Sequence, residues 1–208
     1  MIMKIKVCGL KEQDNINDII QLEPHFIGLI FHPSSKRYIG HDSGLQRYLR
    51  SVTNVQKIGV FVNETYNTIL EHIDTYGLNM VQLHGNESPE YCACLSGHIP
   101  IIKAFGIDAD FDFDQLNYYR DSCAYFLFDT ATQDYGGSGK SFDWQLIQRY
   151  HLSKPFILSG GISLKNIQEV RQLKHKNLMC IDVNSRFETA PGIKDIQQIK
   201  TLIDEFRN

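Results

Sequence analysis

Short apolar runs recur along the chain, and longer polar segments separate them. Most runs are apolar on successive residues, and many of their side chains are β-branched or aromatic. This pattern is typical of parallel strands that are covered on both faces, because neither face of such a strand meets solvent. We therefore predict eight strands, over residues 5–9, 26–31, 58–62, 80–85, 100–106, 125–130, 155–161 and 178–183.

Segments with helical spacing lie between the predicted strands. Ser88 and Pro89 form a typical helix start, with serine as the N-cap and proline at the first helical position. Thr65 is a second cap candidate, whereas Gly44 opens another segment and weakens its pattern. Helices are predicted over 14–22, 44–52, 65–76, from 88 onward, and over 111–120, 144–150, 164–173 and 194–206.

The alternation predicts the fold class. Eight strand–helix units in 208 residues give about 26 residues each, close to the minimum for such a repeat. An open doubly wound sheet is the alternative, but eight units favour closure into an α/β fold of the (β/α)8 TIM barrel type. We expect residues 1–208 to form one such domain, with its active site at the carboxyl ends of the strands.

Composition and charge restrict the partners. Hydrophobic residues make up 42% of the chain and charged residues 22%, the net charge is −3, and basic residues do not cluster, so nucleic acid is not an expected partner. The opening MIMKIKVCGL is too poor in consecutive apolar residues for a signal peptide or a membrane span. We expect a cytoplasmic protein with no membrane contact. An odd number of cysteines, five, without zinc-site spacing predicts neither a disulfide framework nor a metal site.

Reactive and polar residues follow the predicted strands. If the strands form a barrel, their carboxyl ends meet at one mouth, and these residues come together there. A thiol, a guanidinium and a carboxyl group would then share one site. The residues concerned are Cys8, Lys36, Arg37, Asn63, Gln82, His84, Gly85, Asp129, Thr130, Ser159, Gly160, Gly161, Asp182, Asn184 and Ser185.

Two glycine-rich loops predict a phosphate site. LSGGI at 158–162, with Asn184 and Ser185 from the next strand, offers backbone N–H groups to an anion. GGSGKS at 136–141 imitates a nucleotide-binding P-loop, but Asp134 stands where that motif needs its first glycine. We interpret this second loop, with Gly137, Gly139 and Lys140, as a lid over the same phosphate.

Seven motifs together resemble one known family, phosphoribosylanthranilate isomerase of tryptophan biosynthesis. They are KVCGL, SKRYI, GVFVN, VQLHGNE, FDT followed by YGGSGKSFDW, LSGGI with its following NI, and DV-S-E-PGIKD. They stand in the family's order and spacing and cover nearly the whole chain.

The resemblance implies an Amadori rearrangement of N-(5-phosphoribosyl)anthranilate to 1-(2-carboxyphenylamino)-1-deoxyribulose 5-phosphate. By position in the family pattern, Cys8 matches the general base, Asp129 the general acid and Arg37 the residue that binds the anthranilate carboxylate. It further implies a small phosphoribosyl substrate, no cofactor and a monomer. The remaining expected substrate-binding residues are Gln82, His84, Gly137, Gly139, Gly160, Gly161, Asp182, Asn184 and Ser185.

Other interpretations stay open at this point. Taken alone, Cys8 could be a small buried residue, Arg37 a solvated surface residue and Asp129 a turn cap. The rival functions are a non-catalytic phosphosugar sensor, a nucleotide switch, and a sister barrel enzyme such as the histidine-pathway isomerase or indole-glycerol-phosphate synthase. The histidine-pathway isomerase has an aspartate where Cys8 stands.

Two positions depart from the family pattern. Lys36 stands where a proline usually precedes the arginine, so the loop after the second strand is expected to be more mobile. Arg186 stands where a glycine usually follows the serine of the eighth strand. If that position has a positive φ, arginine strains the turn and weakens phosphate binding there, although its side chain could contact the phosphate instead.

Overall fold

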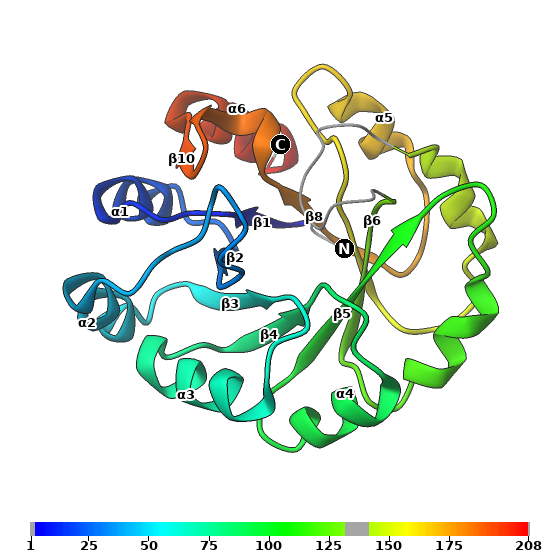
Figure 1. Ribbon diagram of the computed structural model, residues 1–208. Coiled ribbons are helices and arrows are strands. Elements are labelled where there is room, and N and C mark those ends of the chain that lie inside the picture. The colour runs from blue at the N-terminus through cyan, green and yellow to red at the C-terminus, as the bar shows by residue number, and fades with distance from the viewer. Residues whose placement is uncertain (1–2, 132–141, 208) are drawn as a thin grey trace.

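Eight parallel strands close into a barrel in the computed structural model, which describes residues 3–131 and 142–207 (Figure 1). Each strand pairs with the next along the chain, and β1 also pairs with β8. The predicted (β/α)8 fold class is therefore confirmed. The strands are β1 (Lys4–Cys8), β2 (Phe26–Ile30), β3 (Gln56–Phe61), β4 (Met80–Leu83), β5 (Ile101–Ile107), β6 (Tyr125–Thr130), β7 (Phe156–Leu158) and β8 (Leu178–Val183).

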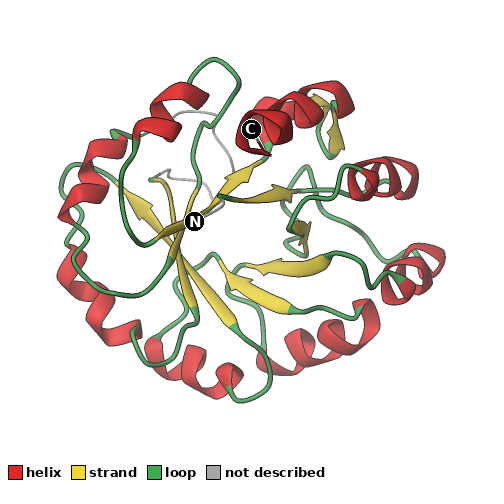
Figure 2. Cartoon of the chain, turned by 180° about the vertical axis from the view of Figure 1, so that it is seen from behind, coloured by secondary structure: helices red, strands yellow, loops and turns green. Residues whose placement is uncertain are grey.

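Helices surround the barrel, as the view from behind also shows (Figure 2). Ser88 and Thr65 cap their helices as expected, accepting hydrogen bonds from the N–H groups of Tyr91 and Thr68. The segment opened by a glycine is also helical, because the Asp42 side chain caps it. The α-helices are α1 (Gln13–Gln21), α2 (Ser43–Ser51), α3 (Tyr66–Tyr76), α4 (Pro89–Ser96), α5 (Ile167–Gln172) and α6 (Ile196–Arg207).

Two of the predicted helices differ in type. The segments after β5 and β6 are 3-10 helices, η1 (Phe113–Tyr119) and η2 (Trp144–Arg149). In both, the capping aspartate, Asp112 or Asp143, accepts from the N–H two residues ahead rather than three. An aspartate cap of this kind is compatible with both a 3-10 and an α-helical start, and both segments are longer than most 3-10 helices.

An unexpected hairpin follows β8. After a short 3-10 turn, η3 (Ser185–Phe187), the antiparallel strands β9 (Glu188–Ala190) and β10 (Ile193–Lys194) pair with each other. Gly192 turns between them with a φ of +89°. The hairpin lies beside the carboxyl ends of β8 and β1, and so adds polar residues to the barrel mouth.

The barrel has two distinct apolar cores. Ile5 and Val7 of β1 pack in the outer core between strands and helices, so Lys6 and Cys8, which alternate with them, face the interior. The inner core is apolar near the amino ends of the strands: Phe26, Ile58, Met80, Ile102, Ala104, Leu127, Ile157, Met179 and Cys180. Polar groups follow it toward the carboxyl ends. No helix in the described residues has the length and apolar character needed to cross a membrane.

Candidate functional site

A buried ion pair forms the floor of the barrel mouth. Lys6 Nζ lies 3.0 Å from Asp182 Oδ2, and the two residues face each other across the register of β1 and β8. Lys6 is fully buried and Asp182 is 6% exposed. Burial disfavours the ammonium, but the charge of Asp182 and the hydrogen bond to it offset this and raise the pKa of Lys6. Lys6 therefore remains protonated at the floor of the mouth.

Cys8 lies directly above this pair at the end of β1. Its thiol is buried against Gly28 of β2, where an added β-carbon would approach Cys8 Sγ to 2.6 Å. Burial raises the pKa of the thiol, and the Asp182 charge adds to this; the positive charges of Lys6 and Lys194 oppose it. The thiol is thus the dominant form in the free protein, while two ammonium groups favour the thiolate.

Asp129 ends β6 on the same mouth. Burial raises the pKa of its carboxyl group, and the Thr130 N–H and the charge of Lys6 only partly counter this. The shift favours the protonated form that a general acid needs. Its side chain is 17% exposed, so it remains accessible from the mouth.

His84 and Gln82 stand beside this acid. Burial and the charges of Lys103 and Lys6 lower the pKa of His84 to about 4, so the imidazole is neutral near pH 7. Gln82 Nε2 lies 2.8 Å from His84 Nδ1, which places the proton of the neutral ring on Nε2 if the amide donates. That nitrogen lies 3.5 Å from Asp129 Oδ2. His84 is therefore suited to hold Asp129 in place.

Two oxygen atoms at the mouth are buried without a hydrogen-bond partner among the described residues. They are Gln82 Oε1 and Asp182 Oδ1. Gln82 is 1% exposed, and a polar atom left unsatisfied at that depth is unfavourable by about 1–3 kcal/mol. Both oxygens are acceptors, so the arrangement suits a ligand that donates hydroxyl groups.

The loop after β7 has the backbone that the sequence predicted. Gly160 and Gly161 have φ values of +89° and +66°, which other residues rarely adopt. A β-carbon at Gly160 would lie 2.5 Å from Thr130 Oγ1, so the loop packs closely against the end of β6. Asn166 Nδ2 fixes the loop by donating to the carbonyl oxygen of Gly161. Within the described part of the chain, neither glycine N–H donates a hydrogen bond, and both can therefore serve an anion.

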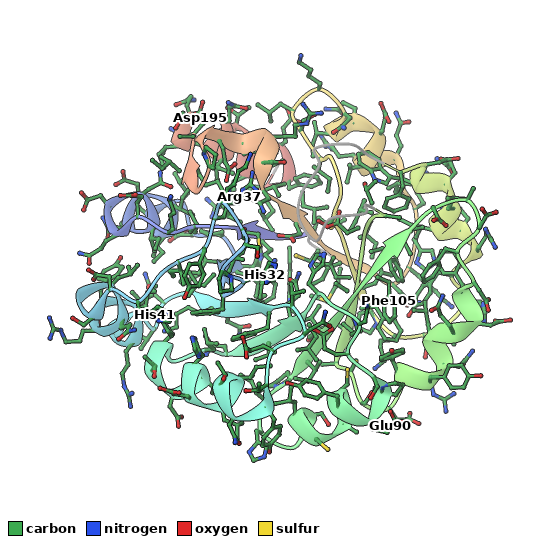
Figure 3. The ribbon with its side chains drawn as sticks, viewed as in Figure 1. His32, Arg37, His41, Glu90, Phe105 and Asp195 are labelled. Carbon is green, nitrogen blue, oxygen red and sulfur yellow. The ribbon has the colours of Figure 1, made fainter. Side chains whose placement is uncertain are left out.

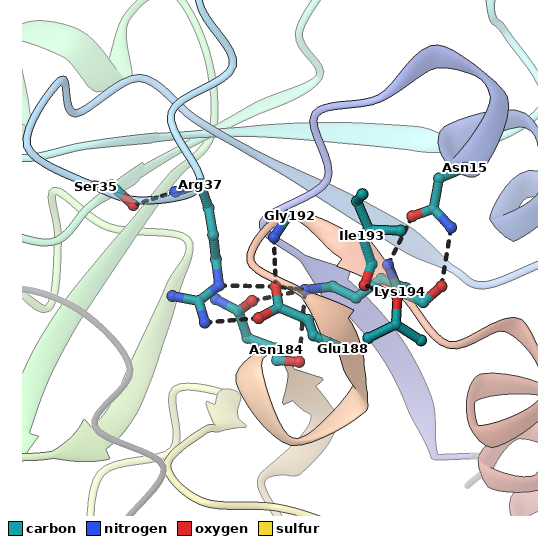
Figure 4. A network of polar contacts seen from close by, with 9 residues as sticks. Asn15, Ser35, Arg37, Asn184, Glu188, Gly192, Ile193 and Lys194 are labelled. Carbon is teal, nitrogen blue, oxygen red and sulfur yellow. Dashed lines mark hydrogen bonds and ion pairs between the residues drawn. The ribbon is translucent and has the colours of Figure 1, made fainter.

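Arg37 reaches the same mouth from the loop after β2 (Figure 3). A β-carbon at Gly9, the residue after Cys8, would lie 2.7 Å from Arg37 Cδ and 2.6 Å from Asn184 Oδ1. The positive φ of Gly9, +75°, and its missing side chain thus admit both neighbours. Arg37 is 13% exposed and forms a bidentate pair with Glu188 (Figure 4).

Some of the remaining predicted residues lie within the described ranges and others outside them. Ser185 begins η3, directly after Asn184. Arg186 has no positive φ, so the backbone strain expected there is absent. Gly137, Gly139 and the rest of 132–141, including the suspected P-loop ending, lie outside the described residues. No group of three or more His, Cys, Asp or Glu side chains able to hold a metal occurs in the described ranges.

The sequence analysis missed three charged residues of the site: Lys6, Glu188 and Lys194. Lys6 offered a usable signal, since it interrupts an apolar strand two positions before Cys8 and so must face the same side. Glu188 and Lys194 offered only a weaker one, as parts of the motif after the eighth strand. Their roles depend on contacts with Arg37, more than 150 positions away.

A family model and a relative of known family both match this sequence over nearly its whole length. The family model described as N-(5'phosphoribosyl)anthranilate (PRA) isomerase matches residues 5–205. The N-(5'-phosphoribosyl)anthranilate isomerase of Parabacteroides distasonis is 43% identical over 205 residues, covering 98% of this chain and 93% of that protein.

Solved structures agree with this match. The phosphoribosyl anthranilate isomerase of Thermus thermophilus superposes with a TM-score of 0.87 at 25% identity, covering 99% of this chain and 98% of that one. Another phosphoribosyl anthranilate isomerase, in complex with reduced 1-(O-carboxyphenylamino)-1-deoxyribulose 5-phosphate, has a TM-score of 0.82 at 30% identity and covers 99% of both chains.

Proposed function

The chain belongs to the N-(5'-phosphoribosyl)anthranilate isomerase family, and from that premise we propose the roles of its residues in the reaction. The protein is an isomerase of tryptophan biosynthesis. We propose that Cys8 is its general base and Asp129 its general acid. The observation that carries this proposal is a buried thiol and a partly buried carboxyl group at one barrel mouth, both under the influence of the Lys6 charge.

In the proposed reaction, Asp129 first donates a proton to the ring oxygen of the ribosyl group. The C1–O bond breaks, and the nitrogen lone pair forms a protonated Schiff base at C1. Cys8 as thiolate then removes the proton from C2, and the electron pair moves toward the iminium nitrogen to give an enolamine. Cys8, now a thiol, returns a proton to C1, and Asp129, now a carboxylate, accepts the proton of the C2 hydroxyl; this gives the ketose and restores the thiolate and the carboxylic acid. Atoms and electrons balance without a cofactor.

The protonation states define a condition for this mechanism. The active form needs a thiolate and a carboxylic acid, so the pair Cys8–Asp129 carries one proton. In the free protein this single proton lies mainly on Cys8. The unperturbed pKa of a thiol is higher than that of a carboxyl group, and burial raises the pKa of the Cys8 thiol further. Lys6 stabilises the thiolate and so increases the minor, active arrangement. Activity should therefore peak between the two apparent pKa values of the pair.

The rest of the mouth binds substrate in this proposal. Arg37 pairs with the anthranilate carboxylate, and Gly160, Gly161, Asn184 and Ser185 hold the phosphate through backbone N–H groups. Gln82 Oε1 and Asp182 Oδ1 accept from sugar hydroxyls, which satisfies both buried oxygens. Gly137 and Gly139 belong to a loop expected to close over the phosphate. A monomer and a cytoplasmic location stay predictions.

Purified protein and N-(5-phosphoribosyl)anthranilate test the proposal directly. Fluorescence reports loss of the substrate, and chromatography identifies the ketose product; catalysed conversion is the expected result. Binding without conversion would favour a sensor. Conversion of the histidine-pathway aminoaldose in its place would favour the sister isomerase, and stabilisation by ATP or GTP in a thermal-shift assay would favour the nucleotide switch.

A further inference from the structure

Arg37 is held by a carboxylate on one edge only. Its Nε and Nη2 atoms donate to the two oxygens of Glu188, at 2.8 and 2.7 Å. Figure 4 shows the other terminal nitrogen of Arg37 pointing away from Glu188. A guanidinium has five N–H donors, so this side-on pair leaves the outer edge, made by Nη1 and the second N–H of Nη2, for another carboxylate.

Glu188 is itself fixed by two further donors. Lys194 Nζ lies 2.6 Å from Glu188 Oε1, and the Gly192 N–H donates to the same oxygen at 3.0 Å. Burial opposes the charge of Glu188, yet the bonds from Arg37 and Lys194 lower the pKa of this carboxyl group. Glu188 thus remains ionised and immobile while only 5% of its side chain is exposed.

Lys194 determines the net charge of the corner of the mouth that Arg37, Glu188 and Lys194 form. Arg37 and Glu188 alone would be neutral and would attract an anion only weakly. Lys194 is fully buried and paired to the same carboxylate; burial lowers its pKa, and the charge of Glu188 opposes this and favours the ammonium. With Lys194 as an ammonium, the three groups carry one net positive charge. The ammonium is held from a second side by Asn184 Oδ1, at 2.8 Å. Of the three groups, Arg37 has the most exposed side chain, so its outer edge is where this charge can meet an anion.

The hairpin β9–β10 keeps the corner rigid. The Asn15 side chain of α1 donates to the carbonyl oxygen of Lys194 and accepts from its N–H, at 2.9 and 2.8 Å. This two-point bond ties β10 to the outer layer of the barrel (Figure 4). Glu188 and Lys194 therefore sit on a fixed element, and Arg37, which arrives from a loop, is the group that they orient.

We propose that Glu188 and Lys194 are positioning residues that aim the outer edge of Arg37 at the substrate carboxylate and so set the specificity for a carboxylated arylamine. Glu188 supplies the orientation, and Lys194 restores the positive charge that Glu188 would otherwise cancel. This inference rests on the proposed function, because it assumes that Arg37 meets the carboxylate of N-(5-phosphoribosyl)anthranilate.

The test compares two substrates, N-(5-phosphoribosyl)anthranilate and the N-(5-phosphoribosyl)aniline that lacks the carboxylate. Glu188→Gln should raise KM for the carboxylated substrate at least about tenfold, with kcat within about twofold, and leave KM for the aniline compound unchanged; losing one charge-assisted hydrogen bond has about this effect. Lys194→Met should also raise KM for the carboxylated substrate, and it should in addition lower kcat for both substrates, because the Lys194 charge favours the Cys8 thiolate. Glu205→Gln is the matched control, since it removes an exposed Arg171–Glu205 pair at 2.9 Å far from the mouth.

Glu188→Asp separates orientation from charge. It keeps the negative charge but shortens the side chain by one methylene, so it should resemble Glu188→Gln toward the carboxylated substrate. An aspartate variant with wild-type KM, or equal losses for both substrates, would overturn the inference and leave the proposed function intact. Wild-type protein that converts neither compound would overturn the proposed function and the inference with it. Melting curves of each variant identify a folding defect, and a defect in both Glu188 variants with unchanged KM would also count against positioning.

Discussion

Two strands of the barrel, β1 and β5, each carry a buried lysine beside a carboxylate, and the surroundings of these two lysines differ. Lys103 of β5 lies 3.2 Å from Glu87 and also donates to the carbonyl oxygens of Gly85 and Ala104, at 2.8 and 3.0 Å. Glu87 accepts from the N–H groups of Asn63 and Gly85, at 2.8 and 2.9 Å. This pair lies on the outer side of β5, since Ala104 next to it packs in the inner core. Its bonds to Asn63 and Gly85 hold the loops after β3 and β4.

The pair Lys6–Asp182 faces inward and is not saturated. Asp182 Oδ1 has no partner among the described residues, and the charge of Lys6 acts on both Cys8 and Asp129. A saturated pair has no bond left to offer a ligand, whereas an unsaturated pair has one, although it is less favourable for the fold. For Lys103–Glu87 and Lys6–Asp182, hydrogen-bond saturation therefore separates the pair that holds loops from the pair that can bind a ligand.

The outer pair should show the largest effect on stability. Lys103→Met leaves Glu87 buried without its counter-charge and deprives two carbonyl oxygens of a donor. We expect a loss of about 3–5 kcal/mol in the free energy of unfolding, measured by denaturant titration. The protein that remains folded should keep the two limbs of the kcat/KM profile that report Cys8 and Asp129, because the charges that shift those two pKa values do not include Lys103. Unchanged stability of Lys103→Met, or a shift of its kcat/KM pH profile, would contradict the proposed difference between the two pairs.

The inner site should respond in turnover rather than in stability. Asp129→Asn keeps the shape of the side chain but removes the transferable proton. We expect kcat to fall at least about 100-fold, or about 2.7 kcal/mol in activation free energy, while the melting temperature stays within a few degrees. If turnover survives, another group opens the ring, and His84 beside Asp129 is then the first candidate.

Lys6→Met is the matched partner of Lys103→Met and should move the pH profile. Removal of the ammonium raises the pKa of Cys8 and of Asp129, because Lys6 lowers both in the wild type. Both limbs of the kcat/KM profile should shift to higher pH. At neutral pH the thiolate fraction falls about tenfold for each unit that the Cys8 pKa rises. A Lys6→Met profile that coincides with the wild type would show that the inner pair, too, is merely structural.

The smallest effect is expected at Arg186, outside both pairs. This residue is exposed and has no positive φ, so a glycine would relieve no strain. Arg186→Gly should leave kcat/KM within about fivefold of wild type, since an exposed contact contributes little. A larger loss in steady-state kinetics would show that Arg186 takes part in phosphate binding.

Much of the fold could be predicted from the sequence, because the strands are short, apolar and separated by recognisable caps. The runs 125–130 and 178–183 coincide with β6 and β8, and Ser88 starts α4 as expected. The helical type of η1 and η2 could not be foreseen, since Asp112 and Asp143 suit both kinds of turn. The residues at the strand ends were predicted together because parallel strands bring their carboxyl ends to one side.

The charge network of the site could be predicted only in part. Lys6 was detectable as the single lysine inside its strand run, whereas Glu188 and Lys194 depend on a hairpin that no local pattern announced. These two short strands are held in part by Asn15 and Arg37, both distant in sequence, which bind the backbone of Lys194 and the side chain of Glu188. Long-range pairing of this kind has no local signature.

The central claim is that the thiol of Cys8 is the base, and one comparison tests it most directly. Turnover of N-(5-phosphoribosyl)anthranilate is measured for Cys8→Ala and for Cys94→Ala, which alters an exposed cysteine on α4. We expect Cys8→Ala to lose at least about 100-fold in kcat with its melting temperature retained, and Cys94→Ala to match the wild type. Near wild-type turnover by a folded Cys8→Ala protein would contradict the account.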